Sequence, residues 1–432
     1  MIRFLKRTFI SLSIRNYRLF FSGQAISLIG TWIQRTTMGW YVYRLTNSAF
    51  LLGLVTFLSM IPSLFISPFV GAWSDRWNRH KVLIYVQIAF LVQNTILAAL
   101  VLTNVINSEL IYPLLLLAAL QGIIVAFDSP VRQTLLIDLI GDKKKLPNAI
   151  ATNSAMFNGA RLIGPALGGV LIILFSEGVC FAINAVTYLP VIITLNLIRI
   201  SYPKLKPVTT STINQIIDGY RYVYRSFPIR FLIMNLAVYT MFAFSYSTLI
   251  PIFAKDVLNG NSGTQGLLMS TAGIGALIGS FVLASKSSIK GLEVRLIAVG
   301  VVASTALIVF SRSTSLILSM TMMLFIGFGL MMNNASTNTL LQSLVSDEMR
   351  GRVLSTYTTT FMSISPFGAL LAGIISNYFG AQFAMMCSAI ICLIWSLNGI
   401  RLLPRFSKGM LKMLVLNSNS AVYRAPRLRT NP

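Results

Sequence analysis

Long apolar stretches alternate with short polar segments from one end of this chain to the other. A helix needs about 20 mainly apolar residues to cross the roughly 30 Å hydrocarbon core of a bilayer. We predict a transmembrane helix in each of twelve stretches: Phe20–Tyr43, Ala49–Trp73, Val82–Asn104, Leu110–Ser129, Asn148–Phe175, Val179–Leu197, Phe231–Ala254, Leu267–Ser285, Leu296–Phe310, Leu316–Leu341, Val353–Tyr378 and Phe383–Ile400. The pattern therefore predicts an all-α membrane protein.

The composition supports this prediction and excludes other classes of protein. Of the 432 residues, 55% are hydrophobic and only 11% are charged, so little of the chain is left for a soluble domain. The sequence has no Walker-type Gly-x4-Gly-Lys segment, no cysteine spacing that suits a metal, and no nucleophile beside a positioned base. We therefore expect neither an enzyme nor a protein with a cofactor or metal, and no direct use of ATP.

The Lys and Arg residues that give the chain a formal net charge of +24 are unevenly distributed among the loops. Lys and Arg gather in alternate connections and at both chain ends, whereas the intervening connections hold only Arg44, Lys255 and Arg312. The positive-inside rule then predicts that both termini are cytoplasmic, which suits an even number of spans in a cell inner membrane. Nucleic-acid binding would need the charge on one folded face, so it is not expected. The first apolar run is too long for a cleaved signal peptide.

An internal repeat divides the chain. The segment Thr134–Asp142 (TLLIDLIGD) resembles Thr339–Asp347 (TLLQSLVSD), at an offset close to half the chain length. We expect a six-helix bundle in residues 1–200, a central cytoplasmic loop with an amphipathic helix in 201–228, a second six-helix bundle in 229–405, and a basic tail in 406–432 that is disordered or lies against lipid.

The polar hairpin between the second and third spans carries the most informative motif. Its sequence Gly71-Ala-Trp-Ser-Asp75-Arg76-Trp-Asn-Arg79-His-Lys81 places several ionisable groups between two apolar stretches. The spacing resembles the loop between helices 2 and 3 of the major facilitator superfamily of secondary transporters, with Asn78 in place of that family's glycine. The resemblance implies the major facilitator fold, two parallel-repeat bundles with the substrate between them, and a gating role for Gly71, Asp75, Arg76, Arg79 and Lys81.

Further segments extend the resemblance over nearly the whole chain. They match the branch that holds the enterobactin exporters, which is also similar to macrolide efflux pumps and lysophospholipid flippases. The matching segments of this chain are Gly30–Gln34, Gly39–Ser48, Leu52–Val55, Ser129–Gln133, Gln342–Arg352 and Pro366–Gly368. The fifth span holds Gly164, Pro165, Gly168 and Gly169, which resemble the core of the gating motif of drug–proton antiporters; generic small-residue packing is the alternative. The antiporters' fourth-helix arginine is replaced by Ala118, so the usual proton relay is not implied.

Charged residues at membrane depth are candidate functional residues. At 1.5 Å per residue, Arg35 and Arg161 lie roughly 22 and 21 Å along the first and fifth spans. No carboxylate lies at that level, so we expect the two guanidinium groups to hold an anionic ligand, with Gln34, Asn153 and Asn158 adding hydrogen bonds. The alternative is that backbone carbonyls or the outer surface satisfy each arginine.

Asp128 lies deeper along its own helix, roughly 28 Å from the predicted start. This depth matches the level of the Asp75 hairpin, so either Arg79 or Arg132, four residues further along the helix, is its expected partner. In the major facilitator superfamily an acidic residue near this position completes a charge relay with the hairpin, so the resemblance implies a gating role for Asp128 and Arg132.

Together these features predict a monomeric secondary transporter that works by alternating access. It would export an amphipathic, anionic small molecule, with a siderophore as the first candidate, and would draw energy from an ion gradient such as a proton gradient or from the substrate's own gradient. A macrolide or multidrug pump, a lysophospholipid flippase and a non-transporting membrane sensor or scaffold are the alternatives.

Overall fold

The computed structural model describes residues 10–73, 77–141, 145–199, 212–285 and 289–424, and within these ranges the regular secondary structure is entirely helical. Asp75, Arg76 and the 201–211 segment lie outside the described residues. The first half contains η1 (Ile10–Ser13), α2 (Arg15–Thr46), α3 (Ala49–Trp73), α4 (Arg79–Leu102), α5 (Tyr112–Ile140), α6 (Leu146–Leu174) and α7 (Glu177–Leu197).

The short helix α8 (Thr212–Arg225) precedes the membrane spans of the second half. The seventh span of the chain consists of four consecutive helical pieces, α9 (Phe227–Val238), η2 (Tyr239–Ala243), α10 (Tyr246–Ile252) and η3 (Phe253–Val257). The remaining spans are single helices: α11 (Ser262–Ala284), α12 (Leu292–Arg312), α13 (Leu316–Leu344), α14 (Asp347–Phe379) and α15 (Ala381–Arg424).

Eleven helical stretches in the described residues are long and apolar enough to cross a membrane. The helix α2 is the twelfth span, although its polar side chains lower its hydropathy. Gln24 and Gln34 are both buried inside the protein, where neighbouring helices shield them from lipid. The predicted twelve helices are therefore confirmed.

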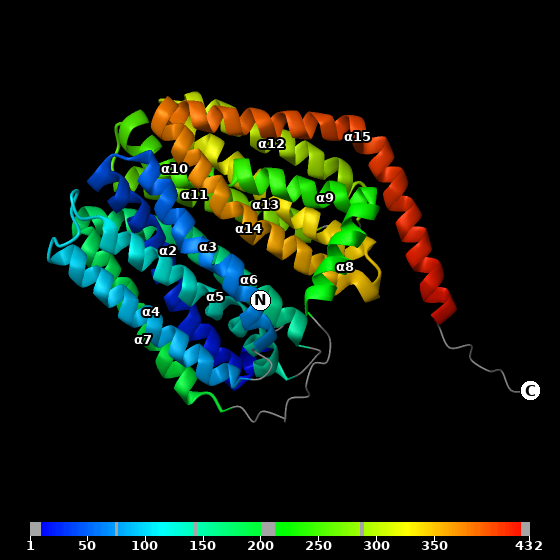
Figure 1. Cartoon of the computed structure of the whole chain (residues 1–432), viewed down its shortest axis with the longest axis horizontal. Coiled ribbons are helices and arrows are strands. Elements are labelled where there is room, and N and C mark those ends of the chain that lie inside the picture. Colours follow the sequence, from blue (N-terminus) through cyan, green and yellow to red (C-terminus); the bar gives the residue numbers. More distant parts are fainter. Residues whose placement is uncertain (1–9, 74–76, 142–144, 200–211, 286–288, 425–432) are drawn as a thin grey trace, which may run out of the picture.

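The two halves repeat the same packing pattern. In the first half α2 packs on α6 and α7, α3 on α5, and α4 on α5 and α7. The second half repeats each contact with its equivalent helices: α9 on α14 and α15, α11 on α13, and α12 on α13 and α15. Figure 1 shows the two bundles side by side, blue to green and green to red. The predicted parallel repeat is therefore confirmed as the architecture of the fold.

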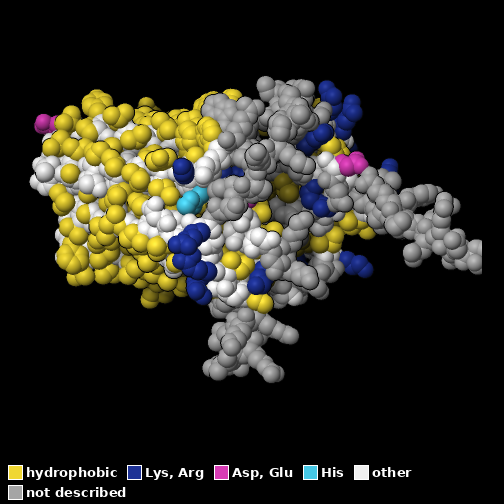
Figure 2. Space-filling view, turned by 90° about the horizontal axis from the view of Figure 1, so that it is seen from below, with side chains coloured by type: hydrophobic (Ala, Val, Ile, Leu, Met, Phe, Trp, Pro, Cys, Tyr) yellow, Lys and Arg dark blue, Asp and Glu magenta, His cyan; other side chains and the backbone are white. Residues whose placement is uncertain are grey.

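The halves meet along two equivalent helix pairs, α3 with α14 and α6 with α11. We call the end of the bundles that carries the α2–α3 turn the closed end, because close contacts between the halves gather there. The opposite end, which carries the starts of α2, α4 and α6, is called the basic end. Figure 2 shows hydrophobic side chains covering the body of the molecule and Lys and Arg gathered toward the basic end.

Several helices extend beyond the predicted spans. The helix α5 continues past Ser129 to Ile140, and α15 continues past Ile400 to Arg424. Hydropathy detects only the lipid-facing length of a helix, whereas backbone hydrogen bonds continue into the polar region. Within the described residues the tail continues the helix α15 up to Arg424, and Phe406 and Met410 are buried against the second half.

The amphipathic helix expected in the central segment corresponds to α8. Gly219 of α8 lies against the backbone of Arg352 at the start of α14, where a Cβ atom would lie only 3.0 Å from the Arg352 carbonyl oxygen. The helix therefore belongs with the second half.

Candidate functional site

A cavity of about 290 Å³ lies between the two halves. The helices α2, α3 and α5 line it from the first half, and α10 and α11 from the second. Its lining combines Met38, Met60 and Met269 with hydroxyl, amide and guanidinium groups, and the described residues that line it include no Asp or Glu. A site between the bundles is the arrangement that alternating access requires.

Arg35 is the charged group in this cavity. Its side chain is exposed although it lies well inside the length of α2, because it borders the open volume. The guanidinium carbon lies 5.3 Å from the centroid of the Trp32 ring. The guanidinium carbon of Arg161, a half-buried residue of α6, lies 6.0 Å from the same ring. The two arginines were predicted to lie at the same depth, and both now lie near the indole ring of Trp32, which shields part of each positive charge.

Gln34 lines the cavity beside Arg35 and is only 1% exposed. Its side-chain carbonyl oxygen accepts a hydrogen bond of 2.5 Å from Asn184 of α7. Asn153 and Asn158 are half-buried on α6 and do not line the cavity. The amide of Asn158 donates to the carbonyl of Ser154 in its own helix, so of the three predicted amide side chains only Gln34 borders the cavity.

Glycines bring the two halves into contact above the cavity, toward the closed end. A Cβ atom on Gly169 of α6 would lie 2.6 Å from the carbonyl oxygen of Ser262, and one on Gly266 of α11 would lie 2.7 Å from that of Pro165. The equivalent pair on α3 and α14 is Gly53 and Gly373. Such backbone approach is possible only without side chains.

The predicted fifth-helix motif therefore has two faces. Gly169 meets the second half, whereas Gly164 and Gly168 face Trp32 and Ile33 of α2 within the first half. Pro165 lies between these faces and is buried inside α6. One motif thus packs α6 on both a helix of its own bundle and a helix of the other.

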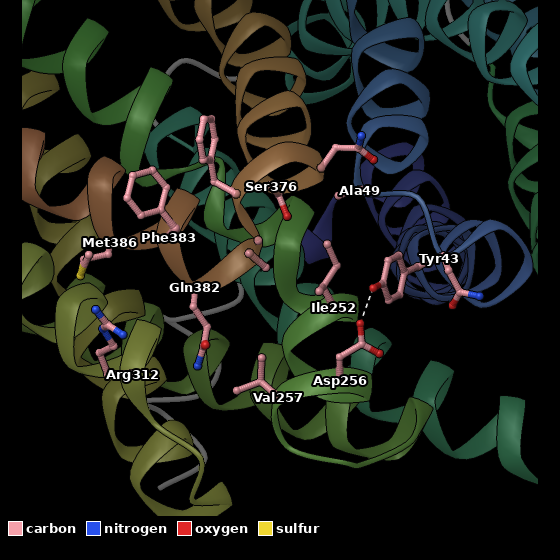
Figure 3. A pocket seen from close by; sticks show the side chains of 15 residues that line it. Tyr43, Ala49, Ile252, Asp256, Val257, Arg312, Ser376, Gln382, Phe383 and Met386 are labelled. Carbon is pink, nitrogen blue, oxygen red and sulfur yellow. Dashed lines mark hydrogen bonds between the residues drawn. The ribbon is translucent and has the colours of Figure 1, made fainter.

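Polar contacts join the halves at the closed end. The hydroxyl of Tyr43 on α2 donates to the carboxylate of Asp256 in η3, as Figure 3 shows. Lys255 donates to the side-chain oxygen of Asn47 at 2.6 Å, and its ammonium lies 5.4 Å from the Tyr43 ring centroid. We call these contacts the closed-end latch. A pocket of about 440 Å³ opens beside it, with Arg312 and Gln382 on its far wall.

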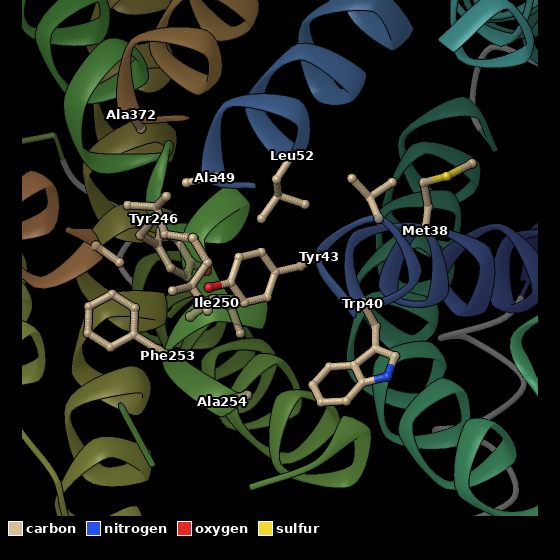
Figure 4. Packing of buried hydrophobic residues seen from close by; sticks show 14 of the residues in the cluster. Met38, Trp40, Tyr43, Ala49, Leu52, Tyr246, Ile250, Phe253, Ala254 and Ala372 are labelled. Carbon is tan, nitrogen blue, oxygen red and sulfur yellow. The ribbon is translucent and has the colours of Figure 1, made fainter. Parts of the chain in front are cut away.

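Beneath the latch, the ring of Tyr43 packs among apolar residues from both halves. Figure 4 shows Leu52 beside it and Tyr246, Ile250 and Phe253 opposite. The seventh span contains two π-helical turns here, η2 and η3, and the second of them carries both Lys255 and Asp256. Such turns are rare and occur frequently at functional sites.

The ion pairs toward the basic end settle the predicted alternatives for Asp128. This residue is 5% exposed, and its two oxygens accept from Arg132 at 2.9 Å and from Gln87 at 2.9 Å. Arg79 pairs instead with Asp138 at 3.0 Å.

Of the predicted hairpin residues, Lys81 is exposed at the mouth of an apolar groove between α4 and α5. Gly71 lies in the last turn of α3.

Several residues that contribute to the cavity and to the contacts between the halves were not predicted from the sequence, among them Gln265, Asp256 and Gly373. Gln265 and Asp256 act through partners more than 200 residues away, and Gly373 has its partner in the other half. The one available signal was a carboxylate, Asp256, at the end of an apolar run. The described residues contain no group of His, Cys, Asp and Glu that suits a metal ion.

The fold, with a cavity between its two halves, is that of a membrane transporter, and a family profile agrees. The profile of the transmembrane secretion effector family of the major facilitator superfamily matches residues 6–415, so the chain belongs to this family of transporters and is not an enzyme. It is a multi-pass membrane protein.

The named relatives include two kinds of transporter. The chain is 28% identical over 384 residues to the staphyloferrin A transporter of Staphylococcus aureus, covering 87% of this chain and 94% of that protein. It is 22% identical over 401 residues to macrolide efflux protein A of Streptococcus pyogenes, covering 86% and 93%.

Solved structures share the fold. A bacterial homologue of the human lysosomal transporter Spinster, in an inward-facing and unoccupied conformation, superposes with a TM-score of 0.71 at 15% identity, covering 92% of this chain and 98% of that one.

Proposed function

We propose that this protein exports an amphipathic, anionic small molecule by alternating access, with a siderophore as the first candidate. The observation that carries the proposal is the charge of the cavity: Arg35 borders it, Arg161 lies across Trp32, and its described lining includes no carboxylate. Uncompensated positive charge is costly inside a membrane protein, and an anionic ligand would neutralise it. The staphyloferrin A transporter among the relatives supports the siderophore as cargo.

The basic end would face the cytoplasm, in keeping with the positive-inside rule. In that orientation the glycine contacts and the closed-end latch would seal the outer side, and the structure would represent the state that takes up cargo from the cytoplasm. Opening the latch and closing the basic end would release the cargo outside. The energy would come from an ion gradient or from the cargo's own gradient, because no nucleotide-binding motif is present in the sequence.

Flux into inside-out vesicles that contain the purified protein tests the proposal. We expect uptake of a carboxylate siderophore in preference to a cationic dye. Arg35→Gln and Arg161→Gln should each lower siderophore flux by about tenfold, as expected for a charge-assisted hydrogen bond worth about 1.5–3 kcal/mol. Arg35→Lys should lower it less, because it keeps the charge but loses the planar fork.

Arg18→Gln is the matched control, because Arg18 is an exposed arginine near the opposite end of the same helix. It should transport normally. Preference for the dye, or unchanged flux in both cavity variants, would contradict the anion site.

A multidrug or macrolide pump is the second candidate. The three methionines in the cavity lining favour it, because their flexible, polarisable side chains adapt to ligands of different shape. Macrolide efflux protein A among the relatives supports the same view. Flux of the dye that is insensitive to Arg35→Gln would favour this function.

A further inference from the structure

One hydroxyl group in the lining of the cavity between the halves is free to donate a hydrogen bond. Four other hydroxyl groups line the cavity, and each donates to a carbonyl of its own helix at 2.8–3.1 Å: Thr31, Thr56, Ser59 and Ser247. Thr248 of α10 also lines the cavity, and its hydroxyl has no acceptor among the described residues. The residue is only 6% exposed, so a ligand in the cavity is what can satisfy this group.

Thr248 is also the side chain with which the second half can donate to a ligand. Gln265 of α11 lines the cavity, but it is 2% exposed and its NH₂ group already donates to a backbone carbonyl of α2 at 3.0 Å. Pro251 and Met269, which complete the described lining from this half, have no side-chain donor. The first half offers the guanidinium group of Arg35, so each half presents a donor to the same cavity.

Arg35 and Thr248 lie at the same level on two helices that meet. The contact is between Gly39 of α2 and Pro251 of α10, where a Cβ atom on the glycine would lie 3.3 Å from the proline ring. Both helices run toward the closed end, where the spans that contain them are joined through the latch.

The spacing along each helix sets this level. Arg35 comes four residues before Gly39 and Thr248 comes three before Pro251, so each shares a helix face with its contact residue. At 1.5 Å per residue they lie about 6 and about 4.5 Å from the contact, both toward the basic end. The guanidinium and the hydroxyl therefore face one part of the cavity from opposite sides.

We infer that the anionic group of the cargo binds between Arg35 and Thr248 and accepts a hydrogen bond from each half. One oxygen of a carboxylate accepts from the guanidinium, and the other accepts from the hydroxyl. The apolar part of the cargo then lies among the methionine side chains of the lining. This inference rests on the proposed function and makes Thr248 a specificity-determining residue for anions.

Such a bridge gives the cargo a mechanical role. Arg35 belongs to the first half and Thr248 to the second, so an anion that accepts from both joins the bundles. A ligand that contacts one half alone has no such effect, because it binds equally well when the halves move apart. The bridged anion therefore stabilises the arrangement of the halves in which the two donors face each other.

Two small molecules with the same apolar body and opposite charges test the inference: 4-phenylbutyrate, which carries one carboxylate, and 4-phenylbutylamine, which carries an ammonium group. Binding to the purified full-length protein is measured by saturation-transfer NMR titration. We expect 4-phenylbutyrate to bind and the amine not to bind. Thr248→Val, which replaces the hydroxyl by a methyl group of similar size, should weaken binding of 4-phenylbutyrate by about tenfold, as for the loss of a hydrogen bond to a charged group. Arg35→Gln should abolish binding.

Ser247→Ala is the matched control. Ser247 is the neighbour of Thr248 and lines the same cavity, but its hydroxyl donates to the carbonyl of Phe244 at 3.1 Å. This variant should bind 4-phenylbutyrate normally, and Thr248→Ser, which keeps a hydroxyl, should restore binding to within about threefold of the unmodified protein.

The melting temperature without ligand separates binding from folding. Thr248→Val removes no hydrogen bond within the described protein, so its melting temperature should equal or exceed that of the unmodified protein. Weaker binding that appears together with a lower melting temperature, and also in Ser247→Ala, would show a structural effect and overturn the bridge. If Thr248→Val does not fold, Thr248→Ala removes the same hydroxyl and decides the question.

The remaining outcomes separate this inference from the proposed function. Unchanged binding in Thr248→Val, with binding lost in Arg35→Gln, would overturn the bridge and leave the anion site standing. Preference for 4-phenylbutylamine, absence of binding, or binding of 4-phenylbutyrate that persists in Arg35→Gln would overturn the anion site and the bridge with it.

Discussion

At the scale of single residues, local helix geometry decides the partner of Asp128. The carboxylate lies one turn before Arg132 on α5, a spacing that brings the two side chains together without any tertiary contact. Gln87 of α4 occupies the second oxygen and ties the pair to the neighbouring helix. Arg79 is held by Asp138 instead, so two separate ion pairs take the place of a relay through Asp128 and Arg79.

A double-mutant cycle should detect this arrangement. Asp128→Asn and Arg132→Gln should each lower the melting temperature of the purified protein, because each leaves a largely buried group without its charge partner. The double variant should be more stable than the summed losses predict, with a coupling of about 0.5–3 kcal/mol. The cycle of Asp128 with Arg79 should be additive, and coupling in that cycle alone would show that the pairing assigned here is wrong.

The latch at the closed end makes a second residue-scale prediction. Tyr43→Phe removes only the hydroxyl that donates to Asp256. Losing a hydrogen bond to a charged group costs about 1.5–3 kcal/mol, so opening of the closed end should become roughly tenfold more frequent or greater. The labelling rate of a single cysteine at Thr56, in a variant without native cysteines, measures this with an impermeant maleimide applied from the closed end.

Tyr41→Phe provides the control for the latch. The Tyr41 hydroxyl donates to the backbone carbonyl of Ile106 at 2.9 Å, within the first half. Its removal should leave the labelling rate unchanged. Equal rates in the two variants would mean that the Tyr43 contact does not hold the halves together.

At the scale of helices, the apolar pattern predicted which segments span the membrane but not where each helix ends. The extension of α5 to Ile140 and of α15 to Arg424 follows from backbone hydrogen bonding beyond the apolar length, which hydropathy does not register. The matching depths of Arg35 and Arg161 came from the helical rise alone. The roles of Gln265 and Asp256 could not be predicted from the sequence, because they depend on which helix of the other half crosses α2.

The crossing of α6 and α11 gives the prediction for this scale. Gly169→Ala would place a methyl group 2.6 Å from the Ser262 carbonyl oxygen, so the helices must separate. Overpacking of this kind costs about 1–3 kcal/mol, and we expect a lower melting temperature and faster labelling from the closed end. Gly159→Ala on the same helix has no neighbour within 4 Å and should be neutral or slightly stabilising, by up to about 1 kcal/mol. A destabilisation shared by both variants would implicate helix propensity rather than the crossing.

At the scale of the whole molecule, the repeat explains why the gate is symmetric while the binding site is not. The contacts of α3 with α14 and of α6 with α11 are equivalent under the repeat, and each uses a pair of glycines. At the cavity the charged groups lie in one half: Arg35 and Arg161 both belong to the first bundle, whereas the second lines the cavity with uncharged side chains such as Thr248 and Gln265. If the half without charge at the cavity closes on an anion held by the arginines of the first half, the cargo would control the transition.

Two states of such a molecule must differ little in free energy, and this makes the polar hairpin of residues 71–81 sensitive to single charges. Its Asp75 lies outside the described residues, so the expectation rests on the motif. If the carboxylate stabilises only one of the two arrangements of the halves, its loss shifts their populations without unfolding either. A bias of about 1.4 kcal/mol changes the ratio of states tenfold.

Asp75→Asn should therefore lower flux by about tenfold or more while leaving expression, membrane insertion and melting temperature close to those of the unmodified protein. Labelling of the cysteine at Thr56 from the closed end should change in the same variant, because a shifted equilibrium alters how often that end opens. Glu109→Gln is the control, since Glu109 is an exposed carboxylate in a turn at the closed end. Normal flux through a normally folded Asp75→Asn protein would show that this carboxylate does not set the balance between the states.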